Sequence, residues 1–395
     1  MLNVGNCWGR SAIDEEYWWS DEHDDGFCQA MTDSMKQHVV PVATHRDIRR
    51  EIEREIEVMC DAKVQILTVC SVARSSPYPA LASTSSDLIH LLPPLASAHA
   101  GRSDGSPTSA RVAVMSGAYG SGRPHPLGWH CRPAMRKNTR KFVDKRSTDV
   151  LRIWKVPLHP CTAEPGPTDE EDVLTPDELK AIRQLQTLAK KDRCTVLLYE
   201  LFTSSDFSGH RAAFVRAFTR EAKQLGMVLV LDDTMCSVRC GRFFSYQYYE
   251  EVCRPDIVVV GKPWLLSAMI LFTDVKGSDL WAGLGGVATA EADWITMRRA
   301  LHFLRVVRGK NLPGKCAQMG HAVRAYLGAV AVRTAGAIVS GLGAMWHTNL
   351  RIKSPLIHRT MQYQRILPTF TTNPDALVTE IEVDESRPPH RKTRS

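Results

Sequence analysis

The sequence has no Cys-x-x-Cys pair, and its eleven cysteines are scattered along 395 residues. In a chain this long, such spacing indicates reduced thiols rather than a disulfide framework. Cys236, Cys240 and Cys253 lie close together, but no histidine at finger spacing accompanies them, so we expect no metal site. No apolar stretch approaches the roughly 20 residues of a membrane helix. The acidic, tryptophan-rich N-terminus lacks the pattern of a secretory or transit signal. We therefore expect a cytoplasmic protein with no membrane partner.

Aromatic residues are also scarce in the most basic parts of the chain. The formal net charge is +7, and the excess is concentrated in residues 132–146 and 387–395. A surface for single-stranded nucleic acid interleaves basic side chains with aromatic ones, and only Phe142 occurs in these two segments. We interpret them as a solvated loop and a disordered tail, and we expect no nucleic-acid partner.

The length allows two domains, and the pattern of the chain changes along it. Between residues 175 and 261 helical segments alternate with apolar strands, which is the rhythm of a parallel α/β sheet. After about residue 290 helical patterns dominate, so we place a boundary near residues 275–290. The expected units are an N-terminal arm and helix (1–60), a large α/β domain (61–285), a small α+β domain (286–384) and a disordered basic tail (385–395).

Hydrophobic periodicity and turn residues predict the individual elements. The predicted helices span residues 44–59, 175–191, 209–225, 293–307, 315–332 and 375–381. The predicted strands span residues 63–69, 111–115, 194–200, 227–232, 257–261 and, as one glycine-rich stretch, 338–350. We interpret residues 121–170, which are rich in proline and basic residues, as a long excursion over the surface.

Two of the apolar runs end in charged residues. The run LVLD ends on Asp232, and the run IVVVG is followed by Lys262. Runs this apolar suit strands that helices cover on both faces, as in a parallel sheet. Because the carboxyl ends of parallel strands meet at one edge, we expect both side chains in one crevice. This pair suits pyridoxal phosphate, whose aldehyde requires a lysine amine and whose pyridine nitrogen requires a carboxylate.

Six motifs around these runs form an ordered series. They are SGAYGSG (116–122), YELFTSSDF (199–207), LVLDDTMCSVR (229–239), PDIVVVGKPW (255–264), VSGLGAMWHTNL (339–350) and QRILPTFTT (364–372). In this order and at these spacings they resemble motifs of the class III aminotransferases, a branch of the fold-type I pyridoxal-phosphate enzymes. The resemblance implies a mainly parallel central sheet flanked by helices, with a smaller α+β C-terminal domain.

The resemblance also implies roles for residues around the ring of pyridoxal 5'-phosphate. Lys262 matches the catalytic lysine that forms the Schiff base and then moves the substrate proton. Asp232 matches the carboxylate on the pyridine nitrogen, and Tyr119 the aromatic that stacks on the ring. Glu200, at the matching strand end, is expected to contact the cofactor.

Further roles concern the phosphate and the substrates. Ser85 and Ser86 fall where the family's phosphate-binding segment is expected. Arg365 matches the arginine that binds the substrate carboxylate, and a guanidinium fork suits that group in two hydrogen bonds. The implied activity moves an amino group from an amino acid or amine to a keto acid, and the implied assembly is a homodimer.

Several positions depart from the family pattern. The phosphate segment near Ser85 lacks the family's glycine, and Gly283 stands where the family has threonine. After Lys262, Pro263 disfavours the helical region for the lysine, and Trp264 fills space that glycines leave open in the family. These changes keep two alternatives open. One is a non-catalytic binding or assembly subunit of the same fold, and the other is a pyridoxal-phosphate lyase or decarboxylase.

Overall fold

A computed structural model describes most of two predicted domains. The described residues are 42–69, 111–115, 150–153, 156–162, 173–203, 206–249, 253–264, 266–273, 294–353, 357–359, 364–368, 370, 372–384 and 389. The N-terminal arm and the domain boundary expected near residues 275–290 lie outside them, as does the basic tail apart from one residue.

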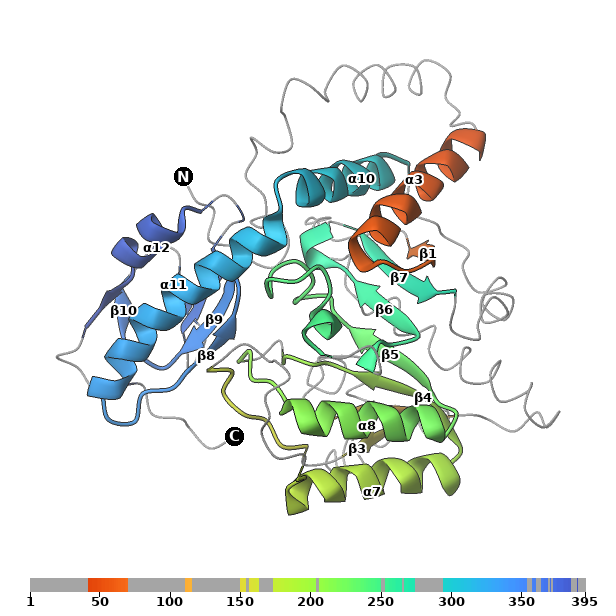
Figure 1. Cartoon of the computed structure of the whole chain (residues 1–395), viewed down its shortest axis with the longest axis horizontal. Helices are drawn as coiled ribbons and strands as arrows, with labels where there is room; N and C mark the ends of the chain where they lie inside the picture. The colour runs from red at the N-terminus through yellow and green to blue at the C-terminus, as the bar shows by residue number, and fades with distance from the viewer. Residues whose placement is uncertain are drawn as a thin grey trace, which may run out of the picture.

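Within these residues, helices and strands alternate from residue 176 to residue 272, and a second, smaller sheet follows (Figure 1). The elements of the large domain and its flanks are α3 (Val42–Cys60), β1 (Val64–Val69), β2 (Arg111–Met115), β3 (Val150–Ile153), α7 (Pro176–Lys190), β4 (Cys194–Tyr199), α8 (Ala212–Gln224), β5 (Val228–Asp232), η4 (Ser245–Tyr248), β6 (Ile257–Val260), η6 (Lys262–Trp264) and β7 (Ser267–Phe272). Those of the C-terminal part are α10 (Trp294–Gly309), α11 (Leu312–Arg333), β8 (Val339–Leu342), β9 (Met345–Thr348), β10 (Ile352–Lys353), β11 (Ile357–Arg359), β12 (Gln364–Ile366), α12 (Pro374–Glu380) and β13 (Glu382–Val383).

The central sheet has seven strands in the order β1-β7-β6-β5-β4-β2-β3. The strands from β6 to β3 are parallel to one another, and β7 and β1 are each antiparallel to their neighbours. The middle strands β5 and β6 are buried along their whole length, as expected for strands that are covered on both faces. The predicted α/β fold with a mainly parallel central sheet is confirmed.

Local sequence explains the helices that flank this sheet. The helix α7 begins with a capping box, in which the Thr175 hydroxyl accepts from the Glu178 amide and the Glu178 carboxylate accepts from the Thr175 amide. Proline at the first helical position fits because its missing N–H would have no partner there. The helix α8 begins at Ala212, later than predicted, because Gly209 exchanges two backbone hydrogen bonds with His159.

The N-terminal helix α3 lies against α10, at the end of the sheet formed by β1 and β7 (Figure 1). Ile48, Ile52 and Ile56 recur at helical spacing and form a buried stripe on one face of α3. Arg305 of α10 also contacts Glu51 of α3 at 2.6 Å, but this pair is exposed and adds little stability. Burial of the apolar stripe therefore holds α3 in place.

The smaller sheet has the strand order β11-β12-β9-β8, and α11 packs against β8 and α12. The stretch predicted as one strand over residues 338–350 is a hairpin, β8 and β9, that turns at Gly343 and Ala344. Gly343 has a φ of 55°, and a Cβ there would lie 2.1 Å from the carbonyl oxygen of Arg239 in the large domain. The Ala344 amide donates to the same oxygen at 2.7 Å. Glycine thus permits a close approach of the hairpin turn to the large domain.

Two strands of the central sheet were not predicted. The surface excursion expected over residues 121–170 contains β3, which pairs in parallel with β2. Its end residue Ile153 is fully buried, so this part of the prediction was wrong. The strand β7 follows the Lys262 turn directly and closes the sheet between β6 and β1. None of the helices described here is long and apolar enough to cross a membrane.

Two glycine substitutions can separate the steric clash at the hairpin turn from the strain of a positive φ. Gly343→Ala places a non-glycine residue at a positive φ and also drives its Cβ into the Arg239 carbonyl. Gly336→Ala has the same kind of backbone strain, with a φ of 76°, but its Cβ would meet no atom within 4 Å. We expect Gly336→Ala to cost about 1 kcal/mol from strain alone and Gly343→Ala to cost clearly more. Urea unfolding of both variants measures the difference, and equal losses of stability would contradict the contact.

Candidate functional site

The candidate site is formed where β4, β5 and β6 end at the same edge of the sheet. Asp232 is the last residue of β5 and lies level with Val259 of β6. Tyr199 of β4 lies level with Leu231, so Glu200 follows at the height of Asp232. The backbone of Lys262 begins the turn η6, two residues after β6 ends. The acid and the lysine of the sequence motif therefore belong to neighbouring strand ends; the lysine side chain lies outside the described atoms.

The Asp232 carboxylate is buried and oriented. Its side chain is 2% exposed, and its Oδ1 accepts hydrogen bonds from the amide of Thr234 at 3.1 Å and from the Thr234 hydroxyl. Donors of this kind stabilise the ionised form of a carboxylate. Glu200 is buried to the same extent at the neighbouring strand end. Glu200 and Asp232 thus bring buried acidic residues to the edge beside the lysine turn.

Gly261 lets the two strand ends approach each other. A Cβ on Gly261 would lie 2.5 Å from Cγ2 of Thr234, closer than side-chain atoms pack. Thr234 is the residue that binds Asp232, and Gly261 directly precedes Lys262. The glycine therefore sets the spacing between the acid and the lysine backbone, and a larger residue there would push the two apart.

Trp264 ties the lysine turn to the loop that follows Asp232. Its indole N–H donates to the Ser237 hydroxyl at 3.0 Å, and its ring packs against Phe243 and Phe244 of the same loop. The side chain is fully buried, so it fills space as we expected. The effect expected of Pro263 was wrong, because Lys262 begins a 3-10 turn that the Trp264 amide closes on the Gly261 carbonyl at 2.8 Å.

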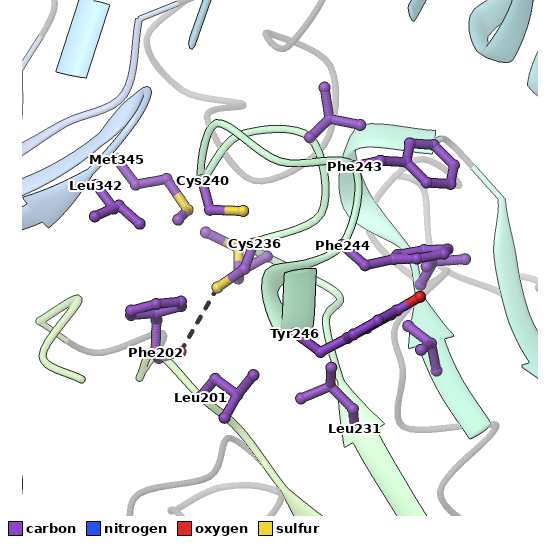
Figure 2. Close-up of a cluster of buried hydrophobic side chains, with 14 of the residues drawn as sticks. Leu201, Phe202, Leu231, Cys236, Cys240, Phe243, Phe244, Tyr246, Leu342 and Met345 are labelled. Carbon is purple, nitrogen blue, oxygen red and sulfur yellow. Dashed lines mark hydrogen bonds between the residues drawn. The ribbon is translucent and has the colours of Figure 1, made fainter. Parts of the chain in front are cut away.

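The loop after β5 folds back over the strand ends as part of the core (Figure 2). Cys236 donates from its thiol to the carbonyl oxygen of Phe202, which follows β4. Cys240 of this loop lies in the same cluster as Met345, which belongs to the small-domain hairpin. All cysteines in the described ranges are free thiols, and those ranges contain no group of three or more His, Cys, Asp or Glu side chains that could hold a metal ion.

Asp233, next to the predicted cofactor ligand, has a separate role that sequence reasoning missed. Its amide donates to the Val259 carbonyl at 2.9 Å, and its Oδ2 accepts from the Ser245 amide at 2.9 Å. Burial, and to a lesser extent the neighbouring charge of Asp232, raise the pKa of its carboxyl to about 7, although hydrogen bonds from Ser245 act in the opposite direction. Asp233 thus anchors the loop, while Asp232 bonds to Thr234.

The predicted substrate residue Arg365 lies in β12, opposite His347 of β9. Its guanidinium carbon is 5.9 Å from the ring centre of Phe207, in the loop that follows β4. Burial lowers the Arg365 pKa, and the nearby charge of Asp206 opposes this shift. Arg365 therefore faces the large domain, beside the segment that continues from Glu200.

Asp206 is the partner that the sequence alone did not reveal. Its Oδ1 accepts from the Thr203 hydroxyl at 2.7 Å and from the Ser208 amide at 3.1 Å. Burial raises the Asp206 pKa, but these hydrogen bonds and the charge of His347 outweigh burial and lower it. The motif TSSDF drew attention to this loop, yet nothing in it indicated that an arginine some 160 positions later would lie beside the aspartate.

Three of the residues predicted to bind the cofactor cannot be compared with this geometry. Ser85, Ser86 and Tyr119 lie outside the described residues. The structure therefore places Asp232, Glu200 and the Lys262 backbone at one sheet edge and Arg365 on the facing domain. The expected contacts to a phosphate and to a ring face stay predictions.

Comparison with known proteins shows a shared fold without a sequence match. No protein-family model matches the sequence, and no curated protein matches it. A lysine aminotransferase from M. tuberculosis in the internal aldimine form matches with a TM-score of 0.64 and 17% identity, over 93% of this chain and 83% of that chain. An omega transaminase from Pseudomonas jessenii in complex with PMP matches with a TM-score of 0.65 and 12% identity, over 95% and 86%. A Bacillus anthracis aminotransferase gives the same four values. The chain thus has the fold of these aminotransferases.

The raised pKa of Asp233 predicts a dependence of stability on pH. The unfolded chain releases this proton near the ordinary value of 3.8, whereas the folded chain holds it until about pH 7. The folded state therefore binds more protons between these values, and stability falls as the pH rises through this window. Asp233→Asn keeps an acceptor for Ser245 but has no charge to bury. We expect it to gain stability relative to the native chain between pH 5 and pH 8, by on the order of a few kcal/mol.

Urea unfolding at pH 5, 6.5 and 8 measures this difference. Asp61→Asn is the matched control, because Asp61 is exposed and its positive φ of 50° suits asparagine equally well. Parallel pH profiles for the native chain and Asp233→Asn would show that the buried carboxyl does not titrate in this window.

Proposed function

We propose that the protein is a class III aminotransferase that uses pyridoxal 5'-phosphate to move an amino group from an amino acid or amine to a keto acid. The observation that supports this most strongly is the junction of β5 and β6. There a buried carboxylate and the backbone of a lysine belong to neighbouring strand ends that a glycine holds close. Amino-group transfer on a pyridine aldehyde needs those two groups in one place.

The residues at the junction suit this cofactor chemically. Asp232 has its Oδ1 bonded to two donors of Thr234, which favours the charged carboxylate that a protonated ring nitrogen requires. Lys262 supplies the only type of side-chain amine that condenses with an aldehyde. Ser85 and Ser86 are the proposed phosphate ligands, and Tyr119 is the proposed stacking aromatic. Glu200 is proposed to contact the cofactor from the end of β4.

Each of these protein groups has a role in the proposed amino transfer. The bound cofactor supplies an electron sink that stabilises negative charge on the substrate carbon. Asp232 keeps a proton on the ring nitrogen. Lys262 Nζ removes the proton from the amine-bearing carbon of the substrate and delivers it on the return step, as a general base and acid. Trp264 and the loop residues around it exclude water from the base of the lysine turn.

Arg365 is proposed to bind the substrate carboxylate. Its guanidinium belongs to the small domain yet faces the loop after β4, so a substrate that contacts it lies between the two domains. A guanidinium fork binds a carboxylate through two parallel hydrogen bonds, which fixes the orientation of the amine as well. We further propose that the protein acts as a cytoplasmic homodimer.

A second candidate is a non-catalytic subunit of the same fold. The indole of Trp264 is fully buried beside the lysine turn, where the family pattern has small residues. If this packing leaves no room for the cofactor ring, the preserved sheet would serve only binding or assembly. Cofactor loading separates the two candidates.

Loading of the purified chain with pyridoxal 5'-phosphate tests the proposal. We expect a yellow protein that absorbs at roughly 420 nm, and borohydride trapping followed by peptide mass spectrometry should place the label on Lys262. Lys262→Ala should lose both signals. Asp232→Asn should keep the label but lower the rate of amino transfer to pyruvate from a panel of amino acids by about 100-fold or more.

Lys180→Ala, on the exposed face of α7, is the control for loss of a lysine without loss of the site. Thermal melting confirms that each variant is folded. A native chain that stays colourless with excess cofactor, or a label that falls elsewhere than Lys262, would reject the aminotransferase and leave the non-catalytic candidate.

A further inference from the structure

The small domain contains a cavity of about 310 Å³ that the proposed reaction does not use. It lies between α11, the beginning of β8, β9 and the segment 156–162, on the side of the small sheet that α11 covers. Pro160 and Thr162 at its edge are exposed, so it opens to solvent.

The cavity exists because one face of α11 has small residues. Arg324, Gly328 and Ala331 follow at helical spacing and line it. A Cβ on Gly328 would meet no atom within 4 Å, so no neighbour requires a glycine there. Glycine is also among the least favourable residues in a helix interior. Packing and helix propensity both favour a larger residue at this position, and the sequence leaves the space empty.

A positive charge borders this space. The guanidinium carbon of Arg324 is 5.5 Å from the ring centre of Trp346, a cation–π distance that fixes the side chain against the cavity wall. Within the described part of the chain, the Arg324 Nε is buried and has no hydrogen-bond partner. An arginine N–H in this situation is a donor that a ligand oxygen can satisfy.

The cavity is separate from the proposed substrate site. Side chains alternate across a sheet, and Trp346 therefore lies on the face opposite to its neighbour His347. His347 pairs with Arg365, on the face toward the large domain. Ser340 belongs to that same face, since it pairs with His347 and donates to the Phe207 carbonyl at 3.0 Å. Val339 lines the cavity on the other face.

We propose that this cavity binds a small organic carboxylate with a compact apolar body, with Arg324 as the anion ligand. The volume is about twice that of an engineered cavity of about 150 Å³ that takes up benzene. Ala331, Ile338 and Val339 offer apolar contacts to the body of the ligand. Because the Arg324 guanidinium already lies over the Trp346 ring, the carboxylate does not occupy that ring face and accepts a hydrogen bond from the Arg324 Nε instead. This inference does not depend on the proposed aminotransferase activity.

Isothermal titration calorimetry with two matched probes tests the charge requirement. The probes are 3-phenylpropionate and its neutral analogue 3-phenylpropanamide. Arg365→Gln serves as the background, so that a carboxylate cannot bind at the proposed substrate arginine. We expect the carboxylate to bind this chain at least about tenfold more tightly than the amide. Equal affinities, or no binding of either probe, would overturn the proposal.

Three further variants locate the site. In the same background, Arg324→Met keeps the aliphatic stem but removes the charge, and should weaken carboxylate binding to the level of the amide. Gly328→Leu fills the hollow while it keeps the arginine, and should abolish binding of both probes. Ala329→Leu, on the exposed face of the same helix turn, should change neither. Carboxylate binding that survives both Arg324→Met and Gly328→Leu would place the ligand elsewhere and refute the assignment.

Discussion

The close approach of β5 and β6 at their carboxyl ends is the constraint on which the site depends. Thr234 holds the Asp232 carboxylate with two donors and presses its methyl group against Gly261, the residue before Lys262. The indole of Trp264 then binds Ser237, so the turn that carries the lysine is fixed to the loop that follows the acid. These contacts couple the two strand ends, which gives the rigidity that the proposed cofactor site requires.

Two adjacent acids at this junction show how environment assigns different tasks to like residues. Asp232 is oriented by the hydroxyl and amide of Thr234, whereas Asp233 bonds to the Ser245 amide and has a raised pKa. A carboxyl that is half protonated near neutral pH avoids a second full negative charge beside the first. The strand end can therefore keep one acid for the proposed cofactor and use the other as an internal anchor.

Much of the fold follows from local sequence, because its signals lie within single elements. The capping box at Thr175 fixes the start of α7, and uninterrupted apolar runs identify β4, β5 and β6. The strand β3 has three apolar residues among its four, but it is short, and the surrounding segment rich in proline and basic residues indicates a loop. The hairpin of β8 and β9 looked like one strand because its turn consists of Gly343 and Ala344, which also suit a strand of small residues.

The candidate site was predictable to the extent that parallel strands end at a common edge. That rule brings Asp232 and the Lys262 backbone together without knowledge of any contact. It does not bring Asp206 to Arg365, since their approach depends on how the small domain sits on the large one. Short motifs name candidate residues, but pairing between distant elements decides which of them face each other.

The hairpin turn at Gly343 has a consequence for the modularity of the chain. The Ala344 amide of the small domain donates to the Arg239 carbonyl of the large domain, and Leu342 and Met345 lie beside Cys240 of the same loop (Figure 2). A fragment that ended before α10 would remove this donor and expose an apolar patch on the loop that follows Asp232, the proposed cofactor-binding carboxylate. The C-terminal domain therefore cannot be exchanged freely. A C-terminal half from another protein would need a glycine-containing turn of the same shape.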